Sequence, residues 1–120
     1  MAKKIDLLKI VQDILNLDPK MRFAAIIDPK GNVREGIMKT GKTSLKSQKE
    51  EELFCKQIAQ RRTMRKEFDK QLGPVNFALA SRQRALAMSF LVNDDILYVV
   101  SEPDADYGIL PKSILEILES

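Results

Sequence analysis

The sequence predicts an α+β fold in which helices pack on a five-stranded antiparallel sheet. Two observations lead to this prediction. Apolar residues recur at helical spacing in three segments and in strand-like runs in five others, in the order α-β-β-α-β-β-β-α. The turns within each group of strands are short, which favours hairpins and therefore antiparallel neighbours. At 120 residues, the chain is expected to form a single domain over residues 1–120.

The first part of the chain is expected to form a helix followed by a hairpin. Apolar side chains recur at helical spacing over residues 4–17, and an Asp-Pro pair ends that helix. Residues 21–27 are apolar on both faces, as in a central strand. A Pro- and Gly-containing turn over residues 28–32 leads into a more polar strand over residues 33–38, which is typical of a sheet edge.

A long helix is predicted over residues 44–71. Three hydroxyl side chains offer N-cap oxygens at its start: Thr43, Ser44 and Ser47. Acidic residues follow in the first turns and basic residues gather in the second half, where each sign of charge complements the helix dipole. A Gly-Pro pair then ends the helix.

Three strands and a last helix complete the chain. We expect strands over residues 75–80, 84–92 and 96–101, joined by turns short enough for hairpins. The last helix carries Leu110 and three further apolar residues at helical spacing, and Pro111 fits its first position.

Residues 36–43 read G-I-M-K-T-G-K-T and match the phosphate-binding pattern G-x-x-x-x-G-K-[S/T]. In such a loop the glycines free backbone N–H groups, the lysine neutralises phosphate and the hydroxyl holds magnesium. The candidate anion- or phosphate-binding residues are Gly36, Gly41, Lys42 and Thr43. A nucleotidase also needs a buried parallel strand before the loop and repeated strand–helix crossovers, whereas this chain predicts hairpins. We therefore favour a plain strand-to-helix connection and keep nucleotide or phosphate binding as an alternative.

The best candidate for an interaction surface is the basic stretch in the second half of the long helix: Arg61, Arg62, Arg65 and Lys66. A solvated helix end explains the same residues, because basic side chains complement the C-terminal dipole. The net charge of +3 is mild, and only Phe68 supplies an aromatic ring nearby. We therefore do not expect nucleic-acid binding.

The composition argues against catalysis. The chain has no histidine, which removes the usual general base and the commonest metal ligand. We expect no catalytic residue, no cofactor and no metal site, although the carboxylates of Glu102, Asp104 and Asp106 could collect a hard cation instead of capping a helix. The single cysteine, Cys55, is expected to pack as a small apolar side chain.

The same composition suggests where the protein resides. A lone cysteine cannot form an internal disulfide and suits a reducing cytoplasm. No stretch approaches the ~20 uninterrupted apolar residues that a membrane helix needs. We expect a cytoplasmic protein that does not insert into membranes.

Two segments resemble the roadblock/dynein-light-chain group of profilin-like domains. They are F-A-A-I-I-D-P-K-G-N-V-R-E-G over residues 23–36 and D-D-I-L-Y-V-V-S-E-P-D-A-D over residues 94–106. The second segment is also similar to a small family of uncharacterised archaeal proteins assigned to this fold. Such domains commonly dimerise through the long middle helix and the neighbouring sheet edge, and several are scaffolds or regulators for small GTPases. The resemblance implies a non-catalytic homodimeric module, a regulator or adaptor for a small GTPase or a signalling complex, with residues 75–80 in the dimer contact.

Two further features leave the function open. The apolar surface of the first helix is broad, with Ile5, Ile10 and Leu17 beside the main stripe, which also favours a symmetric dimer. Four alanines lie in the predicted strands of the second half: Ala78, Ala80, Ala85 and Ala87. They either let helices approach the sheet closely or leave room for a small ligand, so a ligand sensor remains a third alternative.

Overall fold

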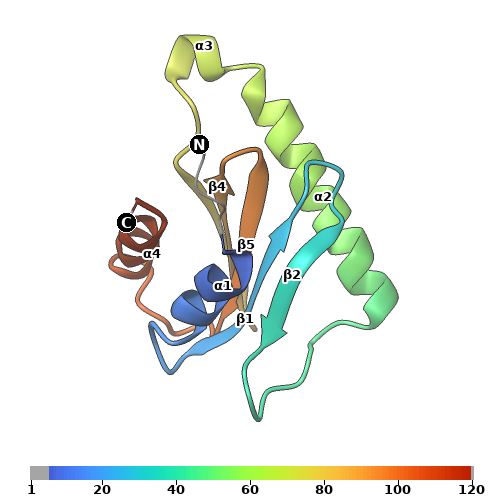
Figure 1. Cartoon of the computed structure of the whole chain (residues 1–120), viewed down its shortest axis with the longest axis vertical. Helices are drawn as coiled ribbons and strands as arrows, with labels where there is room; N and C mark the ends of the chain where they lie inside the picture. The colour runs from blue at the N-terminus through green and yellow to red at the C-terminus, as the bar shows by residue number, and fades with distance from the viewer. Residues whose placement is uncertain (1–5, 120) are drawn as a thin grey trace.

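A computed structural model describes residues 6–119 of the chain. The helices and strands follow one another as α1 (Leu7–Leu15), β1 (Met21–Ile27), β2 (Val33–Met38), α2 (Gln48–Lys66), α3 (Asp69–Leu72), β3 (Phe77–Ser81), β4 (Leu86–Val92), β5 (Asp95–Ser101) and α4 (Leu110–Glu119). The predicted α+β fold and order of elements are confirmed, and the short helix α3 is an addition to them (Figure 1).

The five strands form one antiparallel sheet in the order β2-β1-β5-β4-β3. β1 and β5 therefore have strands on both sides, which explains why both are apolar on their two faces. β2 and β3 are the edges of the sheet. β2 carries Arg34 and Glu35, as expected of an edge strand, whereas β3 reads F-A-L-A-S and carries no charge.

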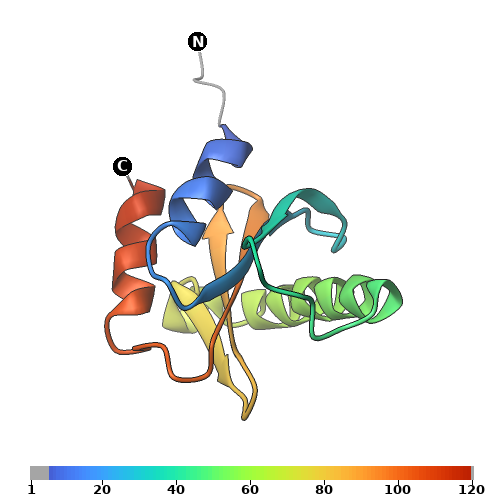
Figure 2. The same ribbon diagram turned by 90° about the horizontal axis from the view of Figure 1, so that it is seen from below.

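Helices cover the two faces of the sheet unequally. α1 and α4 pack on one face, where Ile14 and Ile114 share an apolar cluster with Leu97 and Val99 of β5. α2 runs along the opposite face (Figure 2). Among residues 6–119, no helix combines the length and the apolar character that crossing a membrane requires.

The first helix begins later than predicted. Its N-cap is Asp6, whose carboxylate accepts a hydrogen bond of 3.1 Å from the backbone N–H of Lys9, and the helix spans Leu7–Leu15. Of the expected range 4–17, residues 4 and 5 lie outside the described part of the chain, as does the apolar surface contributed by Ile5.

The long helix is also shorter than the predicted range 44–71. Ser47 caps it through a reciprocal capping box with Glu50, at 3.2 Å and 2.9 Å, so α2 begins at Gln48 rather than at residue 44. The helical backbone ends after Lys66 because Phe68 leaves the α-helical conformation at φ −108° and ψ 8°. The chain then forms α3 as a separate turn that projects beyond the sheet (Figure 1).

Candidate functional site

α2 packs on the sheet mainly through β1 and β5, with Ala85 and Ala87 on the β4 side only partly buried against it. Its buried side chains lie in one apolar cluster with residues of β1 and β5; the cluster comprises Cys55, Ile58, Ala59, Ile27, Ile96, Tyr98 and Val100. On β4, Ala87 is paired with Val100 and Ser89 with Tyr98, so both small side chains share this face of the sheet. The strip of the sheet formed by β4 and β3 is therefore left without a helix of its own.

A groove of about 160 Å³ separates α2 from this strip. Its sheet side is formed by small residues, among them Ala78, Ala80, Ala87 and Ser89. Neighbouring strands lie about 4.8 Å apart, and a helix with its side chains is roughly 10 Å across. The two uncovered strands thus offer about the width of one more helix.

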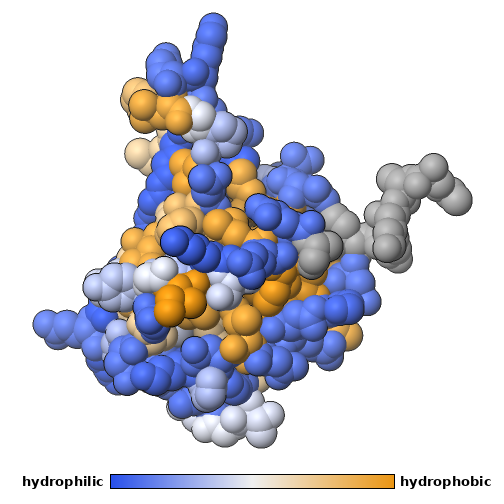
Figure 3. All heavy atoms as spheres, turned by 90° about the vertical axis from the view of Figure 1, so that its left-hand side faces the viewer, coloured by the Kyte–Doolittle hydropathy of each residue, from blue (hydrophilic) through white to orange (hydrophobic). Residues whose placement is uncertain are grey.

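Apolar side chains are exposed along α2 and around the end of the molecule that carries α3. Met64 is 65% exposed, Phe68 57% and Leu72 82%. Figure 3 shows apolar atoms among hydrophilic ones at this projecting end. An apolar surface of this kind usually marks a contact with another molecule.

The charges of α2 are segregated along its length. Glu50, Glu51 and Glu52 lie in its first half, whereas Arg61, Arg62, Arg65 and Lys66 lie in its second half. Arg61 donates a long hydrogen bond of 3.4 Å to Gln57. None of these four basic side chains forms an ion pair with a carboxylate of residues 6–119. They are therefore free to meet a partner, and their role as an interaction surface stays a prediction.

The G-I-M-K-T-G-K-T segment divides between an edge strand and a loop. Gly36 lies in β2, opposite Ala25 of its antiparallel neighbour. Gly41 occupies a turn at φ +84°, and the backbone N–H of Lys42 donates to the carbonyl of Lys39 at 3.0 Å. Thr43 precedes the first helical residue, Gln48, by five positions. The segment connects an antiparallel hairpin to α2 and does not run directly into a helix.

Lys42 is held by an ion cluster outside the loop. Its Nζ lies 2.8 Å from Oε1 of Glu102, and Nη1 of Arg22 lies 2.7 Å from the same oxygen. Arg22 also donates to the backbone carbonyl of Thr43 at 2.8 Å. The hydrogen bonds from Lys42 and Arg22 lower the pKa of the Glu102 carboxyl. The cluster ties the connection to β1 and to the residue that follows β5, and an anion at Lys42 would have to compete with Glu102. Phosphate binding by this segment stays a prediction.

The acidic residues after β5 do not converge. Glu102 joins the ion cluster, and Asp104 pairs instead with Lys20 at 2.9 Å. Asp106 accepts a hydrogen bond from the backbone N–H of Gly108 at 2.9 Å. Within residues 6–119, no group of three or more thiol or carboxylate side chains is placed to hold a metal ion.

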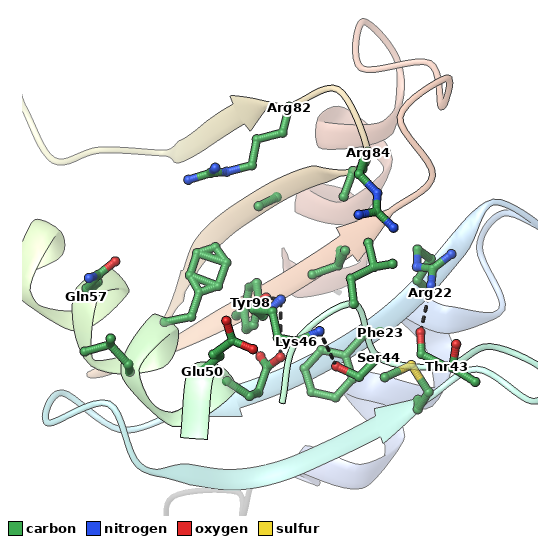
Figure 4. Close-up of a pocket in the computed structure, with 18 residues that line it drawn as sticks. Arg22, Phe23, Thr43, Ser44, Lys46, Glu50, Gln57, Arg82, Arg84 and Tyr98 are labelled. Atoms are coloured by element: carbon green, nitrogen blue, oxygen red, sulfur yellow. Dashed lines mark hydrogen bonds and ion pairs between the residues drawn. The ribbon is translucent and has the colours of Figure 1, made fainter. Parts of the chain in front are cut away.

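A cavity of about 400 Å³ lies on the α2 side of the sheet, between the 39–47 connection, the first half of α2 and the hairpin that joins β3 to β4 (Figure 4). Three aromatic rings line it. The ring of Tyr98 meets those of Phe23 and Phe54 edge to face, at centroid distances of 5.7 Å and 5.4 Å. Nζ of Lys46 lies 4.6 Å from the centroid of the Phe54 ring, within the range of a cation–π contact.

Several polar groups in the cavity wall hold one another, whereas Oε1 of Glu51 is buried without a hydrogen-bond partner among residues 6–119. Nζ of Lys46 donates to the buried hydroxyl of Tyr98 at 3.2 Å and lies 3.3 Å from Oε2 of Glu51. Burial, and then the Glu51 carboxylate, raise the pKa of the Tyr98 hydroxyl. Lys46 therefore neutralises Glu51 within the chain.

Two arginines of the cavity wall were not among the candidate residues predicted from the sequence. Arg82 lies in the predicted turn and Arg84 at the predicted start of the next strand. Figure 4 shows both across the cavity from Glu50 and Gln57. The one available signal was the R-Q-R triplet, because hairpin turns more often carry Asn, Asp or Gly. Nothing in that triplet indicates which face of the sheet its side chains reach.

Solved structures of the same fold include roadblock domains. The chain is similar to a Roadblock/LC7 domain from Streptomyces avermitilis, with 12% identity, a TM-score of 0.73, and coverage of 96% of this chain and 93% of that one. It is also similar to the gliding protein MglB from Thermus thermophilus, with 15% identity, a TM-score of 0.72, and coverage of 98% and 91%. A structure described as MglB with tetrameric arrangement gives 15% identity, a TM-score of 0.71, and coverage of 94% and 88%.

These likenesses establish the roadblock/profilin-like fold. No curated protein matches the sequence. One protein family does, the "Family of unknown function (DUF6659)", and the match covers residues 6–120. The chain belongs to this family.

Proposed function

We propose that this chain is a non-catalytic binding module that forms a homodimer and acts as a regulator or adaptor, for a small GTPase or a signalling complex. The observation that carries the proposal is the uncovered strip of β3 and β4 beside α2. Because its width suits one helix, the α2 helix of a second copy is a fitting occupant.

The edge strand β3 also favours pairing with a second copy of the chain. Edge strands that stay free in solution are usually protected by charges, proline or bulges. β2 has charged side chains and a register shift opposite Ile26 and Ile27, whereas β3 has only Phe, Ala, Leu and Ser. An unprotected edge is suited to pairing with the β3 strand of a second copy about a two-fold axis.

The charges of α2 favour an antiparallel arrangement in that dimer. A two-fold axis perpendicular to α2 would place its acidic first half against the basic second half of the partner's α2. A parallel arrangement would place like charges together. The basic interaction surface and the dimer contact would then share one helix.

The proposed partner class rests on the resemblance to roadblock domains, several of which serve small GTPases. One structure with this fold is described as having a tetrameric arrangement, and that description concerns the other protein. We also propose that the protein is cytoplasmic and that it is related to the archaeal proteins which residues 94–106 resemble.

Light scattering during size-exclusion chromatography tests self-association. At tens of micromolar we expect twice the chain mass of 13.6 kDa. Ala80→Lys, on the exposed edge strand β3, should give the monomer, because it adds a charge to the unprotected edge. Val33→Lys, on the exposed β2 edge, is the matched control and should leave the dimer intact. A wild-type chain that stays monomeric would contradict the proposal.

The GTPase assignment needs its own experiment. Calorimetric titration with purified small GTPases, each loaded with GDP or with a non-hydrolysable GTP analogue, should show binding to one nucleotide state of a partner GTPase. Equal or absent binding to both states would argue against a regulatory role while leaving self-association intact.

A further inference from the structure

We propose that the cavity between α2 and the β3–β4 hairpin binds a small organic anion: a flat apolar ring that carries a carboxylate or phosphate group. The cavity is about 400 Å³ in volume, within the range of roughly 300–1,000 Å³ typical of small-molecule sites. It adjoins the groove of the proposed dimer contact and shares Phe54, Arg82, Ala87 and Tyr98 with it, but the inference does not depend on self-association.

The base of the cavity suits a flat apolar group. Phe23, Phe54 and Tyr98 present ring edges and faces there, and aromatic neighbours favour edge-to-face or offset stacking. On the strand side the lining includes Ala85 and Ala87, whose side chains end at Cβ and leave space above Tyr98 and Val100. A larger side chain at either alanine would fill this space.

The charge balance of the cavity wall favours an anion. Arg22 is paired with Glu102, which also binds Lys42, and Lys46 is paired with Glu51. The carboxylate of Glu50 is engaged with the backbone N–H of Ser47 in the capping box.

This leaves Arg82 and Arg84, which are exposed and form no ion pair with any residue of the described chain. Two guanidinium groups at the rim of an apolar cavity are well suited to a planar carboxylate or a phosphate, because their N–H groups can bind two oxygens at once. The acidic group of the ligand would lie at these arginines and its ring would extend toward Tyr98.

The assignment differs from the phosphate pattern read in the sequence. Thr43 and Ser44 belong to the cavity wall, but Lys42 does not, because its ammonium group is bound to Glu102. A ligand in the cavity should therefore depend on Arg82 and Arg84 and be indifferent to Lys42. A phosphate held by the G-I-M-K-T-G-K-T loop should show the opposite dependence.

Fluorescence titration with 8-anilinonaphthalene-1-sulfonate, an anion that carries a flat naphthalene ring, tests the site. We expect saturable binding of one probe per chain, weakened at least ten-fold in the Arg82→Gln/Arg84→Gln variant. Ala87→Leu should also weaken the probe by filling the cavity. Lys42→Ala should bind normally, as should Leu72→Ser, which removes an apolar side chain from the exposed α3 end. Circular dichroism checks that each variant is folded.

Competition then identifies the acidic group. Displacement of the probe by 1-naphthoate indicates a carboxylate ligand, and displacement by AMP indicates a phosphate ligand; either outcome supports the proposal. The proposal is overturned if the wild-type chain shows no saturable binding of the probe. It is equally overturned if the Arg82→Gln/Arg84→Gln and Ala87→Leu variants, both folded, bind as tightly as the wild type.

Discussion

Gly31 lies directly against the backbone of Lys56 in the middle of α2. A Cβ atom on Gly31 would lie 2.7 Å from Cα of Lys56 and 2.9 Å from the carbonyl oxygen of Cys55. Gly31 also has φ +89°, in a turn that Asp28 closes by accepting hydrogen bonds from the backbone N–H groups of Lys30 and Asn32. The turn between β1 and β2 thus fixes α2 over the central strands and leaves the β3 side open.

Gly31→Ala is expected to destabilise the protein more than an ordinary turn substitution. The left-handed conformation costs a non-glycine residue about 1–2 kcal/mol, and the added methyl group would also push α2 away from the turn. We expect a total loss of roughly 2–4 kcal/mol in the free energy of unfolding, measured by urea denaturation.

Gly41→Ala provides the matched control. Gly41 has a similar φ of +84°, but a Cβ there would have no atom within 4 Å. Gly41→Ala should therefore lower the free energy of unfolding only by the conformational cost of about 1–2 kcal/mol. Equal losses for the two substitutions would show that contact with α2 contributes nothing.

Cys55 is expected to make stability fall at alkaline pH. Its side chain is 1% exposed, and burial raises the pKa of the thiol from 9.0 to about 11. The folded state therefore keeps its proton while the unfolded chain loses it. The stabilisation is fully present below pH 9 and is lost as the pH rises from 9 to 11, with a slope of at most about 1.4 kcal/mol per pH unit.

Urea unfolding at pH 8, 9 and 10 measures this slope. Cys55→Ala should flatten it, because the substitution removes the titrating thiol. Tyr98 adds a loss in the same direction as the pH approaches and passes the ordinary pKa of tyrosine, 10.0, so the difference between wild type and Cys55→Ala, and not the slope alone, isolates Cys55. An unchanged slope in Cys55→Ala would assign the effect to another group. Native Cys55 should also react with a disulfide reagent far more slowly than the unfolded chain.

Glu102→Gln is expected to loosen the connection before α2. The carboxylate of Glu102 binds both Lys42 and Arg22, and Arg22 in turn holds the carbonyl of Thr43. Without the negative charge, backbone amides in residues 39–47 should exchange with solvent faster at neutral pH, as hydrogen-exchange mass spectrometry would detect.

The same substitution has an acid-pH signature. Because hydrogen bonds lower the pKa of Glu102 below 4.5, its contribution to stability is present above pH 4.5 and is lost as the pH falls through the lowered value. Glu102→Gln should remove this part of the acid dependence. For hydrogen exchange, Asp104→Asn is the control, because its carboxylate pairs with Lys20 and does not contact the connection. It is not a control for the acid dependence, because the hydrogen bond from Lys20 lowers the pKa of Asp104 as well. Similar exchange rates in both variants would contradict a specific role for Glu102.

The strands were largely predictable because their signals are local. Apolar runs bounded by turn residues predicted the bounds of β1 and β2 correctly, and the charges of β2 indicated that it is an edge strand. The start of α2 was missed although its signal was present. Only Ser47 has a glutamate three residues later, at Glu50, and that pair forms the capping box.

The site was not predictable, because it depends on where α2 lies across the sheet. A sequence pattern identifies the apolar face of a helix but not the strands that it covers. The G-K-T loop shows the same limit. Its residues match a phosphate loop one by one, yet Gly36 is paired in an antiparallel edge strand, and Lys42 is bound to a carboxylate sixty positions away in the chain. Contacts of such range decide what a short motif can bind.

The antiparallel dimer predicts a specific pattern of charge complementation on α2. Glu50 and Arg61 lie on the same face of α2, whereas Glu52 lies toward the β1–β2 turn. Glu50→Arg would place like charges against the partner's basic half, and Arg61→Glu would place like charges against its acidic half. By symmetry each change affects two contacts. Exposed ion pairs contribute about 0.2–1 kcal/mol each, so each single variant should dimerise roughly ten-fold more weakly in sedimentation equilibrium.

Mixing the two variants should restore the affinity, because a Glu50→Arg chain and an Arg61→Glu chain complement each other at both contacts. Lys112→Glu, on the exposed side of α4 and away from α2, should leave the dimer unchanged and controls for net charge. In a parallel dimer each half of α2 would face the same half of the partner's α2. A single charge reversal would then leave like charges opposed, as in the wild type, and would not weaken the dimer. Only the mixture would change its affinity. Weak single variants that fail to recover on mixing would therefore rule out the antiparallel contact and leave β3 as the element to test next.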